Sequence, residues 1–378
     1  MASWHSATKA SNDNKEYIMA NRIIRRTSTS RRPVVRRSRA RKEQSSLSPE
    51  RLLQLGTGYW GSRTLLSAVE LGVFSILSKG ALDEAQLRER LGLHPRAARD
   101  FFDALVALGP LLRQAGKYRN APDSNAFLDR AKPAYIGGVL EMNATRLYAF
   151  WGSLTEALRT GAPQNEAKTG GDFFGALYSD PERLRGFLAA MTGLSMGSAR
   201  AIARKFPWKS YATLVDVGCA QGCLPVQVAL AHKHVRGTGF DLPSVQPIFD
   251  DYARSFRLGD RLAFAGGNFF RDPLPPADVI VLGHILHDWN LGEKHLLLQK
   301  AYAALPKRGA LIVYDAMIDD ARSHIVPGLL MSLNMLIETP GGFDYTPSDC
   351  RGWMKAAGFR NTTLVPLTPA ESMVIATK

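Results

Sequence analysis

The chain has 378 residues, of which 45% are hydrophobic and 22% are charged, a composition typical of a globular protein with room for two domains. Its net charge of +14 is unevenly distributed, because residues 1–50 hold 12 Lys and Arg against 4 Asp and Glu, a net of +8. The basic character therefore belongs largely to the N-terminal stretch and says little about nucleic-acid binding by the rest of the chain.

Composition also argues against several other classes of protein. No apolar run reaches the ~18 residues that a membrane span needs, so we expect no membrane partner. The three cysteines, Cys219, Cys223 and Cys350, are too few and wrongly spaced for a zinc site or a disulfide framework. We therefore expect no metal site and a reducing, cytoplasmic environment.

Residues 1–47 contain few apolar side chains and many Arg and Ser residues, so the pattern predicts a disordered basic leader. Two other interpretations stay open, an organelle transit peptide and a tail that binds nucleic acid or an anionic surface. Met19 is an alternative start, so the role of the leader is not fixed by the sequence.

Residues 48–135 show the pattern of a winged helix. Apolar residues recur at helical spacing from Leu65 to Leu77, and Asp83 with Gln86 forms a helix-start box. A helix over 95–108 and a short hairpin over 111–120 follow. The order of helices and hairpin predicts a winged-helix domain.

The residues of the 95–108 helix decide between DNA binding and dimerisation. Arg96 and Arg99 are accompanied by Asp100 and Asp103, and the opposite face is apolar. Mixed charge of this kind argues against a phosphate-seeking surface and against a nucleic-acid partner. We therefore expect this domain to form a homodimer, with the apolar face between Leu65 and Leu77 contributing.

The remaining chain divides into two parts. The pattern of residues 136–206 predicts helices that connect the two domains and cover a ligand site. Residues 207–378 alternate strands and helices, which predicts a mostly parallel sheet covered on both faces. The expected strands are 213–217, 236–242, 262–266, 278–283 and 310–314, with a closing hairpin of 362–367 and 372–376.

A strand over 214–217 runs into a turn from Gly218 to Gly222, and a second strand ends in Asp241. Strand, glycine turn, helix, strand and acid is the general pattern of a nucleotide-binding unit, in which the acid takes ribose hydroxyls. The spacing does not fit a dinucleotide clamp, but it fits the turn of S-adenosylmethionine (SAM) methyltransferases with Ala220 in place of the middle glycine.

His287 lies just past the C-terminal end of the fourth strand, at the same sheet edge as the glycine turn. Asp315 follows the fifth strand at this edge, and Asp344 follows a turn over 340–342 that could bring it back over the site. Ligands of open α/β sheets bind at the carboxyl ends of the strands, so the position favours a catalytic histidine over a buried structural one.

Taken in this order, the motifs resemble the SAM-dependent O-methyltransferases of the caffeic-acid and acetylserotonin type, over about residues 50–378. They comprise the 216–222 turn, Gly-Phe-Asp-Leu-Pro at 239–243, Gly-Gly-Asn-Phe-Phe at 266–270, Leu-His-Asp-Trp at 286–289, Asp315 and Pro-Gly-Gly-x-Asp at 340–344. The resemblance implies a Rossmann-like class I methyltransferase sheet, SAM as methyl donor and S-adenosylhomocysteine as product.

The resemblance also implies roles for individual residues. His287 is the general base, flanked by Asp315 and Asp344, which are commonly Glu in plant members. The implied cofactor-binding residues are Ser195, Asp216, Gly218, Asp241, Leu242, Asn268, Phe269 and Gly283. The implied substrate-contacting residues are Met191, Asp288, Met335 and Thr339, of which the methionines could equally be helix core.

The sequence thus predicts a metal-independent transfer of methyl to a hydroxyl of a small aromatic or polyketide-like metabolite. An imidazole next to a carboxylate suits this reaction, because it can take the phenolic proton as the new bond forms. Two alternatives remain: an N-methyltransferase or a non-methylating SAM-using relative on the same fold, and a SAM-responsive DNA-binding regulator.

Overall fold

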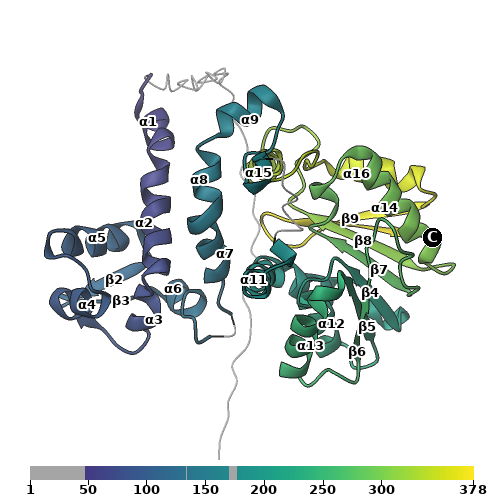
Figure 1. Ribbon diagram of the computed structural model, residues 1–378, viewed down its shortest axis with the longest axis horizontal. Coiled ribbons are helices and arrows are strands. Elements are labelled where there is room, and N and C mark those ends of the chain that lie inside the picture. Colours follow the sequence, from purple (N-terminus) through teal and green to yellow (C-terminus); the bar gives the residue numbers. More distant parts are fainter. Residues whose placement is uncertain (1–46, 133, 170–176) are drawn as a thin grey trace, which may run out of the picture. The chain divides into compact units, whose positions relative to one another are not determined.

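The computed structural model of the protein describes residues 47–132, 134–169 and 177–378 (Figure 1). Of these, residues 52–378 belong to one compact unit. The predicted leader, residues 1–47, lies outside the described residues except for Leu47.

The N-terminal part is a helical domain with a small three-stranded antiparallel sheet in the order β1-β3-β2. The predicted hairpin is present as β2 and β3, whereas the two-residue strand β1, which pairs Leu82 with Tyr118, was not expected. Asp83 forms the predicted capping box with Gln86. The elements are α1 (Glu50–Gly56), α2 (Gly58–Glu70), α3 (Val73–Leu77), β1 (Leu82–Asp83), α4 (Glu84–Leu91), α5 (Pro95–Leu108), β2 (Leu111–Gln114) and β3 (Lys117–Asn120).

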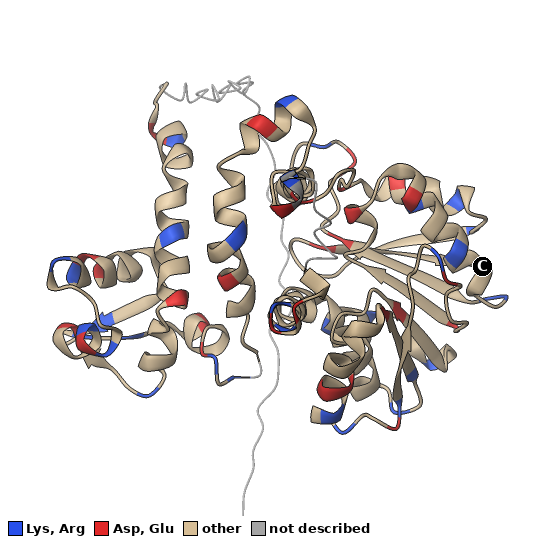
Figure 2. Ribbon diagram, in the orientation of Figure 1, with Lys and Arg blue, Asp and Glu red and all other residues tan. Residues whose placement is uncertain are grey.

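Helix α5 has the place that the DNA-recognition helix has in a DNA-binding winged helix. Its apolar face, with Phe102 and Leu105, is buried in the local core. Asp103 of this helix accepts hydrogen bonds from Arg113 at 2.5 Å and from Tyr118 at 2.7 Å. Its carboxylate is therefore bound to the β2–β3 hairpin. Acidic and basic positions are interspersed in this domain (Figure 2).

Helices also occupy the middle of the chain, as predicted. The longest, α11, has 25 residues and begins at the N-cap Asp180, whose carboxylate accepts the N–H groups of Glu182 and Arg183. A π-helical turn, η1, was not expected and continues α7 into α8. The elements are α6 (Pro122–Phe127), α7 (Gly137–Met142), η1 (Asn143–Leu147), α8 (Tyr148–Trp151), α9 (Leu154–Thr160), η2 (Glu166–Thr169) and α11 (Pro181–Lys205).

The C-terminal part is built on a seven-stranded sheet in the order β6-β5-β4-β7-β8-β10-β9. Neighbours from β6 to β8 pair in parallel, while β10 is antiparallel to both β8 and β9. This is the predicted parallel sheet with a closing hairpin. The strands are β4 (Thr213–Val217), β5 (Arg236–Asp241), β6 (Leu262–Gly266), β7 (Val279–Gly283), β8 (Ala310–Asp315), β9 (Asn361–Pro366) and β10 (Ser372–Thr377).

The central strands β7 and β8 are almost continuously apolar and buried, because helices cover both faces of the sheet (Figure 1). Among the described residues, no helix combines the length and the apolar character that crossing a membrane requires. The helices and short turns are η3 (Trp208–Ser210), α12 (Cys223–Ala231), η4 (Pro243–Val245), α13 (Gln246–Ser255), η5 (Leu286–Asp288), α14 (Leu291–Ala304), α15 (Val326–Glu338) and α16 (Pro347–Ala356).

The turn after β4 adopts left-handed backbone conformations at Gly218, Ala220 and Gly222, with φ of 69°, 49° and 91°. Glycine adopts these angles without steric cost, whereas alanine does not. Ala220 therefore keeps the turn geometry at the expense of local strain. A Cβ on Gly222 would also lie 2.6 Å from the buried ring of Phe249.

We expect Gly222→Ala to lower the free energy of unfolding by about 2–4 kcal/mol, through backbone strain and overpacking against Phe249. Thermal unfolding followed by circular dichroism measures the change. Gly259→Ala is the matched control, since a Cβ there would meet its nearest neighbour only at 3.8 Å. Equal losses in the two variants would contradict this explanation of the turn.

Candidate active site

A cavity of about 660 Å³ opens at the carboxyl edge of the sheet. Its walls come from α11, from the turns after β4, β5, β6 and β7, and from the residues that follow α15. A volume of this size suits a small-molecule ligand. The predicted site residues that line it are Met191, Ser195, Asp216, Gly218, Asp241, Leu242, Asn268, Phe269, Gly283, Asp288 and Thr339.

Four predicted site residues do not line the cavity: His287, Asp315, Asp344 and Met335. The first three form a buried cluster next to it. Met335 is 6% exposed within α15, and its carbonyl accepts the Thr339 hydroxyl one turn later. Thr339 is the C-cap of α15 and has an extended backbone, so its side chain leaves the helical face of Met335 and reaches the cavity while Met335 packs in the core.

Two glycines keep backbone exposed in the cavity wall. A Cβ on Gly218 would lie 2.2 Å from Ile285 Cδ1, and one on Gly283 would lie 2.0 Å from the Tyr314 ring. Any larger residue would therefore displace a side chain that also lines the cavity. The wall on this side is shaped for close approach of a ligand to the main chain.

Asp241 ends β5 and joins two strand ends. Its carboxylate accepts the backbone N–H of Ala220 at 3.0 Å and that of Leu242 at 2.8 Å. Burial raises the pKa of Asp241 to about 6 despite these two hydrogen bonds. Burial, together with the charge of Asp241, raises the pKa of Asp216 to about 8.

The turn after β6 places an aromatic wall in the cavity. The side-chain oxygen of Asn268 accepts the N–H of Phe270 at 2.9 Å, which fixes the turn. The ring of Phe269 lies edge-on to Phe270, with centroids 4.8 Å apart, and to Trp289, at 5.8 Å. Phe269, Phe270 and Trp289 all line the cavity, so a flat ligand meets aromatic surface here.

His287 is held between carboxylates. Its Nδ1 hydrogen-bonds Asp344 Oδ1 at 3.3 Å and lies 3.7 Å from Asp315 Oδ1, while its Nε2 lies 3.6 Å from Asp288 Oδ1. The 340–342 turn brings Asp344 back, and a Cβ on Gly342 would lie 2.5 Å from the His287 carbonyl oxygen. The shorter Asp side chains therefore still reach the imidazole.

The charges of this cluster shift its pKa values. Burial by itself lowers the pKa of His287, but Asp315, Asp344 and Asp288 outweigh it and raise the pKa to about 10. Burial raises the pKa of Asp288 and of Asp315 to about 6, against the attraction of the imidazolium. The hydroxyl of Tyr345 donates a hydrogen bond to Asp315 Oδ2. The cluster thus holds its imidazole protonated near neutral pH.

His284 is a cavity residue that the sequence did not single out. Its Nδ1 lies 3.9 Å from Asp315 Oδ1 and its Nε2 lies 3.3 Å from Glu371 Oε1, and Glu371 also accepts the Ser198 hydroxyl. The left-handed φ of 54° that aims this ring is not visible in a sequence. Only its place three residues before His287 could have suggested a role.

His284, His287 and Asp315 offer ligand atoms that all lie within 4.8 Å of one another, so these three could hold a metal ion. The expectation of a metal-independent reaction stays a prediction. Chelation followed by an activity assay tests it.

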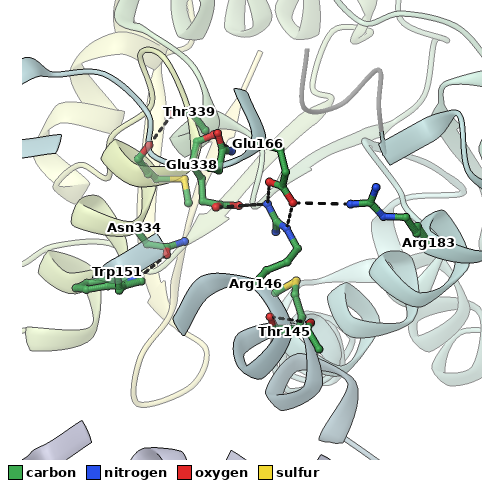
Figure 3. A network of polar contacts seen from close by, with 11 residues as sticks. Thr145, Arg146, Trp151, Glu166, Arg183, Asn334, Glu338 and Thr339 are labelled. Carbon is green, nitrogen blue, oxygen red and sulfur yellow. Dashed lines mark hydrogen bonds and ion pairs between the residues drawn. The ribbon is translucent and has the colours of Figure 1, made fainter. Parts of the chain in front are cut away.

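A network of ion pairs and hydrogen bonds connects the helices next to the cavity (Figure 3). Arg146 donates to Glu166 at 2.7 Å and to Glu338 at 3.2 Å, and the indole N–H of Trp151 donates to Asn334 at 2.9 Å. Glu338 and Thr339 both line the cavity. These contacts therefore hold the connecting helices against the C-terminal end of α15, which adjoins the cavity.

The parallel sheet with its antiparallel closing hairpin, the glycine turn and the acid at the end of β5 define a class I SAM-dependent methyltransferase. The chain belongs to the O-methyltransferase family: the family model for the O-methyltransferase domain matches residues 151–360, and that for the O-methyltransferase dimerisation domain matches residues 53–130. It is a SAM-dependent enzyme with an N-terminal dimerisation domain.

Named relatives agree with this assignment. The chain is 44% identical over 331 residues to the tetracenomycin polyketide synthesis 8-O-methyl transferase TcmO of Streptomyces glaucescens, covering 87% of this chain and 97% of the relative. It is 38% identical to the N,N-dimethyltransferase OxyT of Streptomyces rimosus, covering 82% and 90%. The crystal structure of human N-acetylserotonin methyltransferase in complex with SAM matches with a TM-score of 0.80 and 28% identity, covering 89% and 99%.

The sequence predicts that Asp241 accepts the ribose hydroxyls of SAM, so we expect its raised pKa to make SAM binding sensitive to pH. We expect the dissociation constant for SAM to increase as pH falls through about 6, because the protonated carboxyl accepts ribose hydroxyls less well. Asp241→Asn should weaken binding about 10- to 100-fold and abolish this pH step. Isothermal titration calorimetry measures both effects, with the exposed Asp260→Asn as control. An unchanged pH step in Asp241→Asn would contradict the role of Asp241.

Proposed function

We propose that this enzyme methylates a hydroxyl group of a small aromatic or polyketide-like metabolite. The observation that carries the proposal is an aromatic-walled cavity with a buried acid–base cluster directly behind it. Similarity to an enzyme of tetracenomycin polyketide synthesis supports the substrate class. We also propose that it works in the reducing cytoplasm, which suits three buried free cysteines.

The wall built from the turns after β4, β5 and β6 fits SAM. Asp241 would accept the ribose hydroxyls, Asn268 and Phe269 would bracket the adenine, and Gly218 and Gly283 leave room for close approach of the main chain. Ser195, on α11, would meet the carboxylate of SAM. When bound, SAM supplies an electrophilic methyl group on a sulfonium.

We assign proton removal to His287. A phenol has a pKa of about 10 and an ordinary imidazole has a pKa of about 6.5, so transfer of the phenolic proton to such an imidazole is unfavourable. The three carboxylates raise the pKa of His287 to about 10, which brings donor and acceptor close to balance. Asp344 fixes Nδ1 as the protonated nitrogen, which leaves Nε2 as the acceptor.

Asp288 stands between this base and the cavity. It lines the cavity, and its Oδ1 lies 3.6 Å from His287 Nε2, whereas His287 itself does not line the wall. We propose that the substrate hydroxyl first meets the Asp288 carboxylate and that its proton ends on Nε2. The pair would then act as one acid–base unit.

We expect His287→Ala to lower turnover at least a hundredfold while the dissociation constant for SAM stays unchanged, because the imidazole acts on the acceptor and not on the donor. Steady-state assays with labelled SAM measure turnover. Wild-type turnover should rise with pH toward about 10, since only the neutral imidazole accepts a proton, and the variant should lose this dependence.

The exposed His324→Ala provides the control for a histidine outside the site. Wild-type turnover in His287→Ala would remove the general-base role.

The similarity to OxyT makes a nitrogen acceptor the second candidate. The buried acid–base cluster favours a hydroxyl, because a neutral amine already has a free lone pair for attack and needs less help from a base. Labelled SAM offered with matched phenols and aromatic amines distinguishes the two. Methylation of the amines alone would reverse the assignment.

We further propose that two copies of this chain associate through α1 and α2. The face between Leu65 and Leu77 that was expected to contribute packs instead into the core of its own domain. The exposed large apolar side chains of α1 and α2 are Leu52, Leu53, Leu55, Tyr59 and Trp60. They lie within or next to the stretch that matches the O-methyltransferase dimerisation model, residues 53–130. An exposed apolar surface of this kind is typical of an interface between copies.

The double variant Leu53→Glu/Trp60→Glu should halve the mass measured by light scattering at micromolar concentration, because buried charges oppose association. Leu296→Glu on α14, an exposed leucine outside these helices, is the control. A wild-type protein that is already monomeric would contradict the proposal.

A further inference from the structure

Lys294 is a fully buried cation that the proposed mechanism does not use. It lies in the first turns of α14, which begins at the capping box of Asn290 and Glu293, and its relative exposure is 0%. A lysine is almost never fully buried unless its ammonium group is paired. Its partners therefore indicate why the chain keeps a charge here.

The ammonium group is held by one carbonyl and by aromatic faces. Nζ donates a hydrogen bond to the carbonyl oxygen of Trp289. It lies 3.6 Å from the ring centroid of Phe343, 5.8 Å from that of Tyr345 and 6.0 Å from that of Trp353. Ring faces attract cations and partly replace lost hydration, most strongly where water is excluded.

These partners belong to the segments that carry the acid–base cluster. Trp289 is two residues after His287, on the same loop. Phe343 and Tyr345 flank Asp344, whose carboxylate faces the imidazole, and Tyr345 donates its hydroxyl to Asp315. One ammonium group thus joins the loop of the base to the segment of its main carboxylate partner.

The charges around Lys294 are mostly negative. The carboxylates that act on it are Asp315, Asp344, Asp288 and Glu293, and the phenol of Tyr345 is also adjacent. Three of these carboxylates also surround His287. Without a second cation, the imidazolium alone would balance them, and it would hold its proton more tightly.

We infer that Lys294 is a positioning residue that ties the His287 loop to Asp344 and supplies the fixed counter-charge that lets His287 release its proton and act as a base. The inference rests on the proposed role of His287. It assigns Lys294 no contact with the substrate or with SAM.

The charge state of Lys294 itself provides a distinctive test. Burial lowers its pKa to about 8, against the opposing effect of the carboxylates. The ammonium is therefore mostly charged at pH 7 and mostly neutral above pH 9. A variant without the charge should differ from the wild type at pH 7 and approach it as the wild type loses the same charge.

The experiment compares kcat of the wild type, Lys294→Gln and Lys294→Met between pH 6.5 and 9.5. Glutamine keeps a donor for the Trp289 carbonyl but no charge. We expect kcat of Lys294→Gln to be about tenfold lower at pH 7, equivalent to about one pKa unit on His287, with a deficit that shrinks above pH 8. Lys294→Met should show an additional deficit at every pH, because the carbonyl loses its partner.

The control is Lys355→Met on α16, an exposed lysine that should behave as wild type. A deficit of constant size across the pH range, or none at all, would overturn the counter-charge role. Thermal unfolding and SAM affinity confirm that each variant is folded.

If neither variant folds, Phe343→Leu serves instead. It keeps the lysine but removes the nearest ring face, so the pKa of Lys294 should fall and kcat should drop between pH 7 and 8. A wild-type profile in Phe343→Leu would contradict the inference.

The double variant with His287→Ala separates this inference from the proposed function. If His287 is the base, adding Lys294→Gln to His287→Ala should change the residual rate less than twofold at any pH. A tenfold effect in that background would overturn the link to His287. Full turnover in His287→Ala would contradict both the general-base role of His287 and the inference about Lys294. Loss of turnover in His287→Ala together with wild-type kcat in Lys294→Gln would contradict only the inference about Lys294.

Discussion

The structure depends on one electrostatic arrangement, a buried imidazole surrounded by carboxylates. His287 has Asp344 and Asp315 on one ring nitrogen and Asp288 on the other. Burying several charges is costly unless they are paired, so the surrounding elements must hold these groups within a few ångströms of one another. Three elements hold these groups together: the carboxyl edge of the sheet, the 340–342 turn that leads to Asp344, and helix α14, which carries Lys294.

The arrangement of the cavity follows from the sheet. Parallel strands bring their carboxyl ends to one edge, so residues far apart in the chain, such as Asp216, Asp241 and Gly283, line the same wall. Turns after the strands build one part of the cavity wall, and helix α11 and the C-terminal end of α15 contribute another. The ion pairs of Arg146 with Glu166 and Glu338 join those helices to the sheet domain.

Much of this was predictable, because strand alternation and helix-start boxes are local signals. All seven strands of the main sheet lie within one residue of the predicted limits, and the predicted capping box of Asp83 and Gln86 is present. The exceptions depend on contacts distant in sequence. Strand β1 exists only because β3 pairs with it, and Met335 lies outside the cavity because helix packing turns it into the core.

The order of the elements, the glycine turn and the candidate groups His287, Asp315 and Asp344 can be recognised from residue type and spacing alone. Three features become visible only in the folded chain: Asp288 lies between His287 and the cavity, His284 turns its ring toward Asp315, and Lys294 is buried among aromatic rings. The first two depend on local backbone angles, such as the left-handed φ of His284, and the third depends on packing between segments far apart in the sequence. No local pattern encodes such distances, because burial and charge proximity arise only when the chain is folded.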